Sequence, residues 1–280
     1  RGGAWKDAFL GLGSFQGQNV PGEGRDFFGA TLTGDIIGGL SSVPFAASNN
    51  PADTLYFVKY TASSNSFGTK LKIGDPALNQ TGGSIRYRLA VDGTGNNLLA
   101  LWYKDSVNAS GTGFANSKLM YSTSSNGGTS WGSPQLIQQA RGLNSVLAPG
   151  DTCGPWFGID AVYKPNTTSW GVVWNTLYPK PDNTGLNSGD NQACKVLFYS
   201  PSINGGVPTI VAGSQNMTIL SDTNLFVNRQ NMQVGLTPVS HPSLAYSEDG
   251  TRLFCAFSAF QPGDSLEGFT FNDIWYSYSD

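Results

Sequence analysis

Short apolar runs separated by polar turns dominate the pattern of hydrophobic and polar positions along this chain. Runs at 99–102, 171–174 and 253–257 are rich in aliphatic and aromatic residues, and clusters of Gly, Asn, Ser and Pro separate them. Such runs are typical of β-strands joined by tight turns. Glu, a strong helix former, occurs only three times in 280 residues. The pattern therefore predicts an all-β protein.

The chain carries an internal repeat. In three segments, two apolar strands joined by a turn are followed by a polar insertion and a strand that ends in Tyr-Ser. The tyrosines Tyr121, Tyr199 and Tyr276 lie 78 and 77 residues apart, and a weaker copy spans 55–60. Repeated small antiparallel sheets fit propeller blades better than a sandwich, whose strands need not repeat. We therefore expect one propeller-type domain over 1–280 with about four blade units.

A polar turn follows the Tyr-Ser strands. The first copy reads Ser124-x-Asn126-x-Gly128-x-x-Trp131. A short Asn side chain can cap backbone N–H groups of a turn, and Gly supplies a positive φ. The Trp can fold back to cover the strand pair. The pattern indicates a structural turn.

Other copies of this turn are less complete. The second keeps Ser202, Asn204 and Gly206 and has Thr209 at the Trp position. The copy near 63–71 is degenerate, and the one at 279–280 is cut short. The spacing resembles the Asp-box (BNR repeat), Ser-x-Asp-x-Gly-x-x-Trp, of the sialidase or neuraminidase superfamily, with Asn in the Asp position. The resemblance covers roughly 55–280.

The resemblance implies a sialidase-like β-propeller of four-stranded antiparallel blades. Propellers of this superfamily close with six blades, whereas units of ~77 residues supply only about four in this chain. An open ring leaves edge strands free to mispair. We therefore predict that the propeller is incomplete in this segment, and that further polypeptide or another subunit closes it.

The resemblance also implies a set of catalytic groups. Sialidases use a Tyr nucleophile assisted by Glu and an Asp acid/base, with three arginines that clamp the substrate carboxylate. The family's Phe/Tyr-Arg-Ile-Pro motif is absent from this chain. The catalytic candidates are Arg86, Arg88, Asp160, Arg229 and Glu267.

Each candidate has a structural alternative. Arg86 and Arg88 fall on one face of a strand, where a solvated or ion-paired Arg is the commoner role. Asp160 lies in an apolar strand, where a carboxylate is costly unless it is hydrogen-bonded. It is either an acid/base at the propeller mouth or a structural hydrogen-bond acceptor. The single His, His241, fits a structural role better than a catalytic one.

The cysteines and a group of acidic residues are candidates for a disulfide and for metal ligands. Cys153 and Cys194 flank a polar insertion and form a candidate disulfide, with Cys255 as a buried thiol. Three buried thiols are the alternative. Asp182, Asp190 and nearby Asn residues could ligate Ca²⁺, but their spacing matches no known loop. With one His and no CxxC pair, the sequence predicts no metal site and no cofactor.

Charge and composition limit the classes of binding partner and the cellular location that we expect for this protein. The net charge is −3 and no Lys/Arg cluster stands out, which argues against nucleic-acid binding. No apolar run approaches the ~18 residues that a membrane-spanning helix needs. A composition rich in Gly, Ser, Thr and Asn favours a secreted or cell-surface protein. Asn-x-Ser/Thr sequons are candidate glycosylation sites, and their number is close to that expected by chance. They lie at Asn79, Asn108, Asn166 and Asn216.

Two functions from different classes stay open. The first is a non-catalytic extracellular propeller that binds glycans or other proteins, or forms part of a surface or filament assembly. The second is an exo-glycosidase of sialidase type, with a Tyr/Glu nucleophile pair and an arginine clamp. The missing arginine motif and the scarcity of Glu favour the first.

Overall fold

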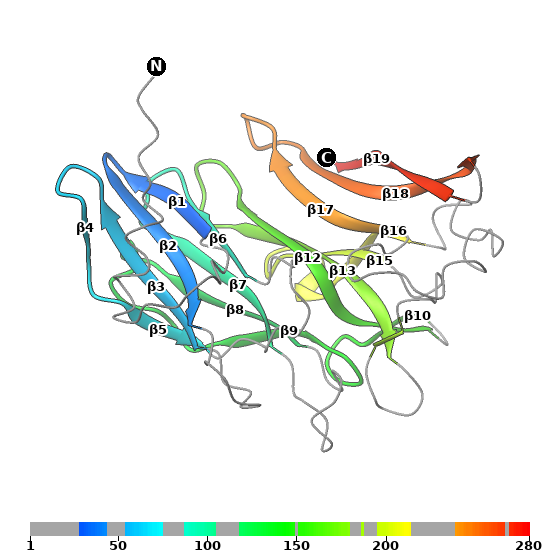
Figure 1. Cartoon of the computed structure of the whole chain (residues 1–280), viewed down its shortest axis with the longest axis horizontal. Helices are drawn as coiled ribbons and strands as arrows, with labels where there is room; N and C mark the ends of the chain where they lie inside the picture. Colours follow the sequence, from blue (N-terminus) through cyan, green and yellow to red (C-terminus); the bar gives the residue numbers. More distant parts are fainter. Residues whose placement is uncertain are drawn as a thin grey trace.

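The computed structural model describes residues 28–43, 54–74, 87–104, 118–148, 151–179, 186–187, 195–213, 239–266 and 269–280. These residues form antiparallel β-sheets joined by turns, with one short 3-10 segment at Asn204–Gly206. The sheets follow one another in chain order (Figure 1). Within the described part of the chain, no helix has the length and apolarity needed to cross a membrane.

Four of the sheets have the form of propeller blades, and we number them in chain order. Blade 1 contains β1 (Phe28–Thr33), β2 (Ile36–Val43), β3 (Thr54–Thr61), β4 (Ser66–Phe67) and β5 (Leu71–Gly74). Blade 2 contains β6 (Tyr87–Val91), β7 (Leu98–Lys104), β8 (Lys118–Ser124) and β9 (Gln135–Gln139).

The other two blades follow the same order. Blade 3 contains β12 (Gly154–Tyr163), β13 (Trp170–Pro179), β15 (Lys195–Tyr199) and β16 (Thr209–Gly213), with the short β14 (Leu186–Asn187) beside β13. Blade 4 contains β17 (Val239–Tyr246), β18 (Leu253–Leu266) and β19 (Phe269–Ser279). A separate two-stranded pair, β10 (Val146–Ala148) and β11 (Asp151–Thr152), precedes blade 3.

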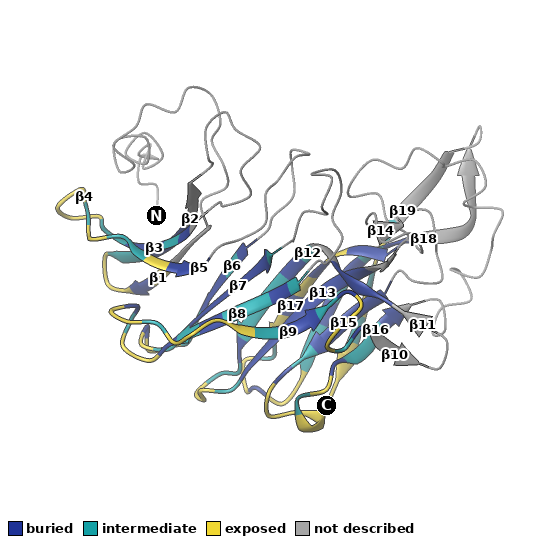
Figure 2. Ribbon diagram, turned by 90° about the horizontal axis from the view of Figure 1, so that it is seen from below, coloured by how far each residue is buried: buried dark blue, intermediate teal, exposed yellow. Residues whose placement is uncertain are grey.

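The blades pack face to face, and the apolar pattern of their strands explains why. In β7, six consecutive residues are buried because the strand has a neighbour on each face. Leu99, Leu101 and Tyr103 join the core shared with blade 3, whereas Leu98 and Trp102 join the core shared with blade 1. A third core links blades 3 and 4. The buried strands run through adjacent sheets, and exposed residues gather in the turns (Figure 2).

The first strands of successive blades lie next to one another. β1 contacts β6, β6 contacts β12, and β12 contacts β17. A glycine makes one of these close approaches feasible: Gly95 in the β6–β7 turn has φ +76°, and a Cβ there would collide with the backbone of Leu32 in β1. The described residues therefore form an all-β propeller of antiparallel blades whose strands do not close into a ring.

Candidate functional site

Two of the catalytic candidates, Arg88 and Asp160, meet between blades 2 and 3. Arg88 comes from β6 and Asp160 from β12, and Arg88 Nε lies 3.2 Å from Asp160 Oδ1. The same Nε donates to the backbone oxygen of Ile159 at 3.1 Å. Only 22% and 15% of the two side chains are exposed. The pair is therefore an inter-blade contact, largely removed from solvent.

The second carboxylate oxygen of Asp160 faces blade 4. Oδ2 accepts a hydrogen bond from Ser243 Oγ at 3.0 Å and another from the backbone N–H of Leu244 at 2.9 Å. One carboxylate thus connects the first strands of three blades, β6, β12 and β17. Since a partly buried carboxylate is costly unless its oxygens are paired, these contacts explain how an apolar strand accommodates Asp160.

Two backbone irregularities bring these groups together. The register of β12 against β13 shifts between Pro155 and Ile159, and the register of β17 against β18 shifts between Ser240 and Ser243. Gly158 has φ +76° at the first shift, and a Cβ there would lie 3.0 Å from Pro242 Cδ at the second. The two bulges therefore face each other, and a side chain at Gly158 would push them apart.

His241 is part of the second bulge. It has φ +51°, an uncommon conformation for a residue other than Gly, and its Nδ1 lies 2.8 Å from Ser240 Oγ. After this residue the strand resumes with Ser243 and Leu244, which contact Asp160. His241 thus shapes the backbone that presents two donors to the carboxylate.

The chemistry of this network is that of a structural ion pair. Arg88 contacts one carboxylate oxygen of Asp160, and Ser243 and Leu244 donate hydrogen bonds to the other. Cys255 lies nearby in the blade 3–4 core, where burial, together with the negative charge of Asp160, raises its pKa to about 12. The Cys255 side chain is therefore a neutral thiol at physiological pH and a poor nucleophile.

Most other candidates lie outside the described residues. This group comprises Arg86, Arg229, Glu267, Cys194, Asp182, Asp190, Asn79, Asn108 and Asn216. Cys153 is fully buried, and Gln138 Nε2 lies 3.6 Å from its sulfur. Asn166 is exposed in the β12–β13 turn with φ +58°. Within the described ranges, no group of three His, Cys, Asp or Glu side chains could hold a metal ion.

The turn after β8 is closed by its own side chains. Ser124 Oγ accepts from the backbone N–H of Gly128 at 2.9 Å and donates to Asn126 Oδ1 at 2.9 Å. Asn126 Oδ1 also accepts from the backbone N–H of Ser130 at 2.9 Å. Trp131 then packs against Phe57 of blade 1, with 5.2 Å between ring centroids. This turn therefore links two blades through an aromatic pair.

The turn after β15 uses different contacts. Ser202 Oγ lies 3.0 Å from Ser200 Oγ, and Asn204 Nδ2 donates to the backbone oxygen of Val207 at 3.2 Å. Positive φ values fall on Asn204, Gly205 and Gly206, whereas in the first turn they fall on Gly127 and Gly128. Thr209 begins β16. The two turns share a sequence pattern but have different hydrogen-bond networks.

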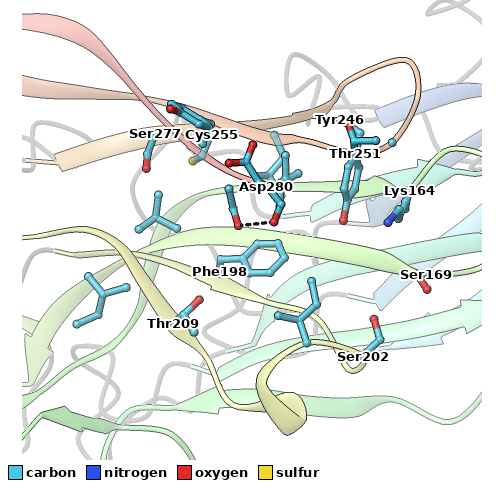
Figure 3. A pocket seen from close by; sticks show the side chains of 18 residues that line it. Lys164, Ser169, Phe198, Ser202, Thr209, Tyr246, Thr251, Cys255, Ser277 and Asp280 are labelled. Atoms are coloured by element: carbon cyan, nitrogen blue, oxygen red, sulfur yellow. Dashed lines mark hydrogen bonds between the residues drawn. The ribbon is translucent and has the colours of Figure 1, made fainter.

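A cavity of about 620 Å³ lies between blades 3 and 4. Phe198 of β15 lies at its centre, with Cys255 and Ser277 on the blade 4 side and Thr209 on the blade 3 side (Figure 3). Lys164 and Asp280 also line it. Sequence reasoning did not identify this cavity, because it depends on which strand faces meet and no local motif marks it.

Comparisons with known proteins complete the description of the site. No protein-family model matches the sequence, and no curated protein matches it. Among solved structures, the chain is similar to the NanB sialidase of Streptococcus pneumoniae, with 8% identity, a TM-score of 0.39, and coverage of 82% of this chain and 26% of that one. It is also similar to Trypanosoma rangeli sialidase, with 10% identity, a TM-score of 0.43, and coverage of 84% of this chain and 34% of that one.

A third structure is the GH93 α-L-arabinofuranosidase of Fusarium graminearum, with 10% identity, a TM-score of 0.43, and coverage of 87% of this chain and 59% of that one. The chain thus spans about a quarter to a third of the two sialidase chains. At these identities and TM-scores, the likeness implies nothing about the activity of this chain.

Proposed function

We propose that this chain is a non-catalytic sialidase-like propeller that serves in binding and assembly as part of a secreted or cell-surface protein. The observation that carries the proposal is the environment of Arg88 and Asp160. These catalytic candidates contact each other, Ile159, Ser243 and Leu244. Their hydrogen-bonding groups connect three blades, which supports a structural role for both side chains.

The exposed side of blade 4 supports a binding role. Ile274, Tyr276 and Tyr278 alternate along β19 and are 84%, 72% and 57% exposed. Large apolar side chains gathered on one strand face are typical of interaction surfaces. Glycans and other extracellular proteins are the ligand classes we propose, since the aromatic content of 12% offers many side chains that could stack on sugar rings.

An activity assay tests the non-catalytic part of this proposal. The chain, and the longest polypeptide that contains it, are incubated with fluorogenic sialosides and with aryl arabinofuranosides, xylosides and galactosides. We expect no release above the buffer rate. Robust turnover that is lost in Asp160→Asn or Arg88→Lys, with unfolding temperatures unchanged, would instead establish an exo-glycosidase.

A glycan array tests the binding part separately. We expect retention of a defined subset of glycans by the unmodified chain and by Asp160→Asn, because the network lies between blades and not at the exposed aromatic face. The matched variant Tyr276→Ala should lose signal if that face holds the glycan. An array on which neither form retains any glycan would leave proteins as the ligand class and refute glycan binding.

A further inference from the structure

Two turns of the repeat contain the same tripeptide, Asn-Gly-Gly, in different surroundings. The tripeptide spans 126–128 after β8 and 204–206 after β15. An asparagine followed by glycine is prone to lose its side-chain amide, because glycine has no side chain to keep its backbone nitrogen away from the asparagine amide carbon. The chain therefore carries two copies of one reactive dipeptide, and the two turns decide how readily each copy reacts.

The first copy is held at its side chain and at its backbone. Asn126 Oδ1 accepts hydrogen bonds from Ser124 Oγ and from the backbone N–H of Ser130, both at 2.9 Å. Asn126 Nδ2 donates to Ser130 Oγ at 2.8 Å. The backbone N–H of Gly127 donates to the backbone oxygen of Asn96, in the neighbouring β6–β7 turn, at 2.8 Å. Other partners therefore fix both groups that must meet for the reaction.

The second copy has fewer restraints. Asn204 Nδ2 donates a hydrogen bond to the backbone oxygen of Val207 at 3.2 Å. In the described part of the chain, the backbone N–H of Gly205 donates no hydrogen bond, and a Cβ at Gly205 would meet no atom within 4 Å. The Gly205 nitrogen can therefore reach the Asn204 amide carbon through a small opening of an exposed turn.

We propose that Asn204 is a site of spontaneous covalent modification, the conversion of asparagine to aspartate and isoaspartate. The deprotonated backbone nitrogen of Gly205 attacks Cγ of Asn204. A new C–N bond forms there, and the bond from Cγ to the side-chain nitrogen breaks as ammonia leaves. Water then opens the resulting cyclic imide at either carbonyl, which gives aspartate or isoaspartate. The net reaction consumes one water molecule and releases one ammonia, with no oxidation or reduction.

Hydrogen bonding, and not exposure, distinguishes the two sites. Asn126 and Asn204 are both exposed, so water reaches both side chains. The rate of attack follows the fraction of molecules in which the turn is open. Opening of the first turn breaks the contacts with Ser124, Ser130 and Asn96. We therefore expect Asn204 to react in the folded chain and Asn126 to be protected.

The modification changes the turn between β15 and β16. A carboxylate at position 204 cannot donate to the backbone oxygen of Val207, and isoaspartate adds a methylene group to the backbone of the turn. Either product also adds a negative charge at neutral pH. Ser202 and Ile203 of the same turn line the cavity between blades 3 and 4. The reaction therefore alters the charge beside this cavity with time and needs no enzyme.

Peptide mass spectrometry of the folded 280-residue chain, aged at neutral pH, measures both sites in one sample. We expect conversion at Asn204 to be at least about tenfold faster than at Asn126, with isoaspartate resolved from aspartate by chromatography. In guanidinium chloride, where both turns are unfolded, this difference should disappear. Equal rates in the folded chain, or a difference that persists in the unfolded chain, would overturn the proposal.

Two serine variants form a matched pair. Ser124→Ala removes a hydroxyl that donates to Asn126 Oδ1, so it should speed conversion of Asn126 at least about threefold. Ser202→Ala removes a hydroxyl that lies 3.0 Å from Ser200 Oγ, and it should leave the rate at Asn204 unchanged. The unfolding temperature of each variant establishes that it remains folded. An Asn126 rate unaltered by Ser124→Ala would contradict the proposal, because it would show that these hydrogen bonds do not protect the site.

Discussion

Blades 2 and 4 place similar side chains of their third strands in very different surroundings. In blade 2, Leu101 pairs with Tyr121 and Tyr103 pairs with Leu119. On the equivalent strands of blade 4, Ala256 pairs with Tyr276 and Ser258 pairs with Ile274. Leu119 is fully buried against blade 3, and the ring centroids of Tyr121 and Trp170 lie 4.9 Å apart in a tilted arrangement.

The matching side chains of blade 4 lie in solvent. Ile274 is 84% exposed and Tyr276 is 72% exposed. The same kind of residue at the same place in the third strand is therefore core where a neighbouring sheet covers it and surface where none of the described residues does. Among the described residues, only the face of blade 4 that meets blade 3 packs against another sheet.

The largest expected effect concerns this pair of faces. Leu119→Ala removes a fully buried side chain between blades 2 and 3 and should lower the free energy of unfolding by about 2–5 kcal/mol. Ile274→Ala, at the matching place in blade 4, should change it by less than about 0.5 kcal/mol. Urea unfolding of both variants measures the difference. Equal losses would mean that the blade 4 face is covered in solution.

The next effect contrasts two ion pairs. Asp160→Asn breaks the partly buried pair with Arg88 between blades and should cost about 2 kcal/mol of unfolding free energy. Asp280→Asn breaks the ion pair with Arg252 in blade 4. The Arg252 side chain is 57% exposed and that of Asp280 is 74% exposed, so the loss should cost less than about 0.5 kcal/mol of unfolding free energy. Thermal unfolding of the two variants measures the difference in stability. An unfolding temperature unchanged by Asp160→Asn would contradict a structural role for the network.

The sequence carries the strand pattern of the fold but not the pairing between blades. Short apolar runs and turn residues indicate strands such as 99–102 and 253–257, because those signals act over a few residues. Arg88 and Asp160 meet only because two blades stack, and no local pattern encodes that distance. The bulge at His241 is equally hidden, since Pro242 after it suggests an irregular strand without giving its register.

The smallest expected effect is in the β17–β18 turn. The hydroxyl of Ser247, with the backbone and hydroxyl of Thr251, donates hydrogen bonds that lower the pKa of Asp249 to about 2 from its ordinary 3.8. Because the pKa of Asp249 is lower in the folded state, its ionised carboxylate stabilises the folded state above pH 4. This stabilisation is lost as the pH falls toward 2. Ser247→Ala should move the Asp249 midpoint upward in an NMR titration.

A control turn in blade 2 sharpens that measurement. Burial opposes ionisation of Asp92, but hydrogen bonds from Asn97 and Thr94 outweigh it, so the pKa of Asp92 is also lowered. Its midpoint should not move in Ser247→Ala. An Asp249 midpoint near 4 in the unmodified chain would show that the turn is open in solution.

Native-state amide hydrogen exchange of the 280-residue chain tests the central comparison most directly. β8, paired on both edges and packed between two blades, should exchange only through large-scale opening. Among the described residues, β19 pairs only with β18. The amides of β19 that point away from β18 should exchange at least about a hundredfold faster than those of β8. Protection of β19 equal to that of β8 would contradict the account, because it would mean that a strand already covers this edge.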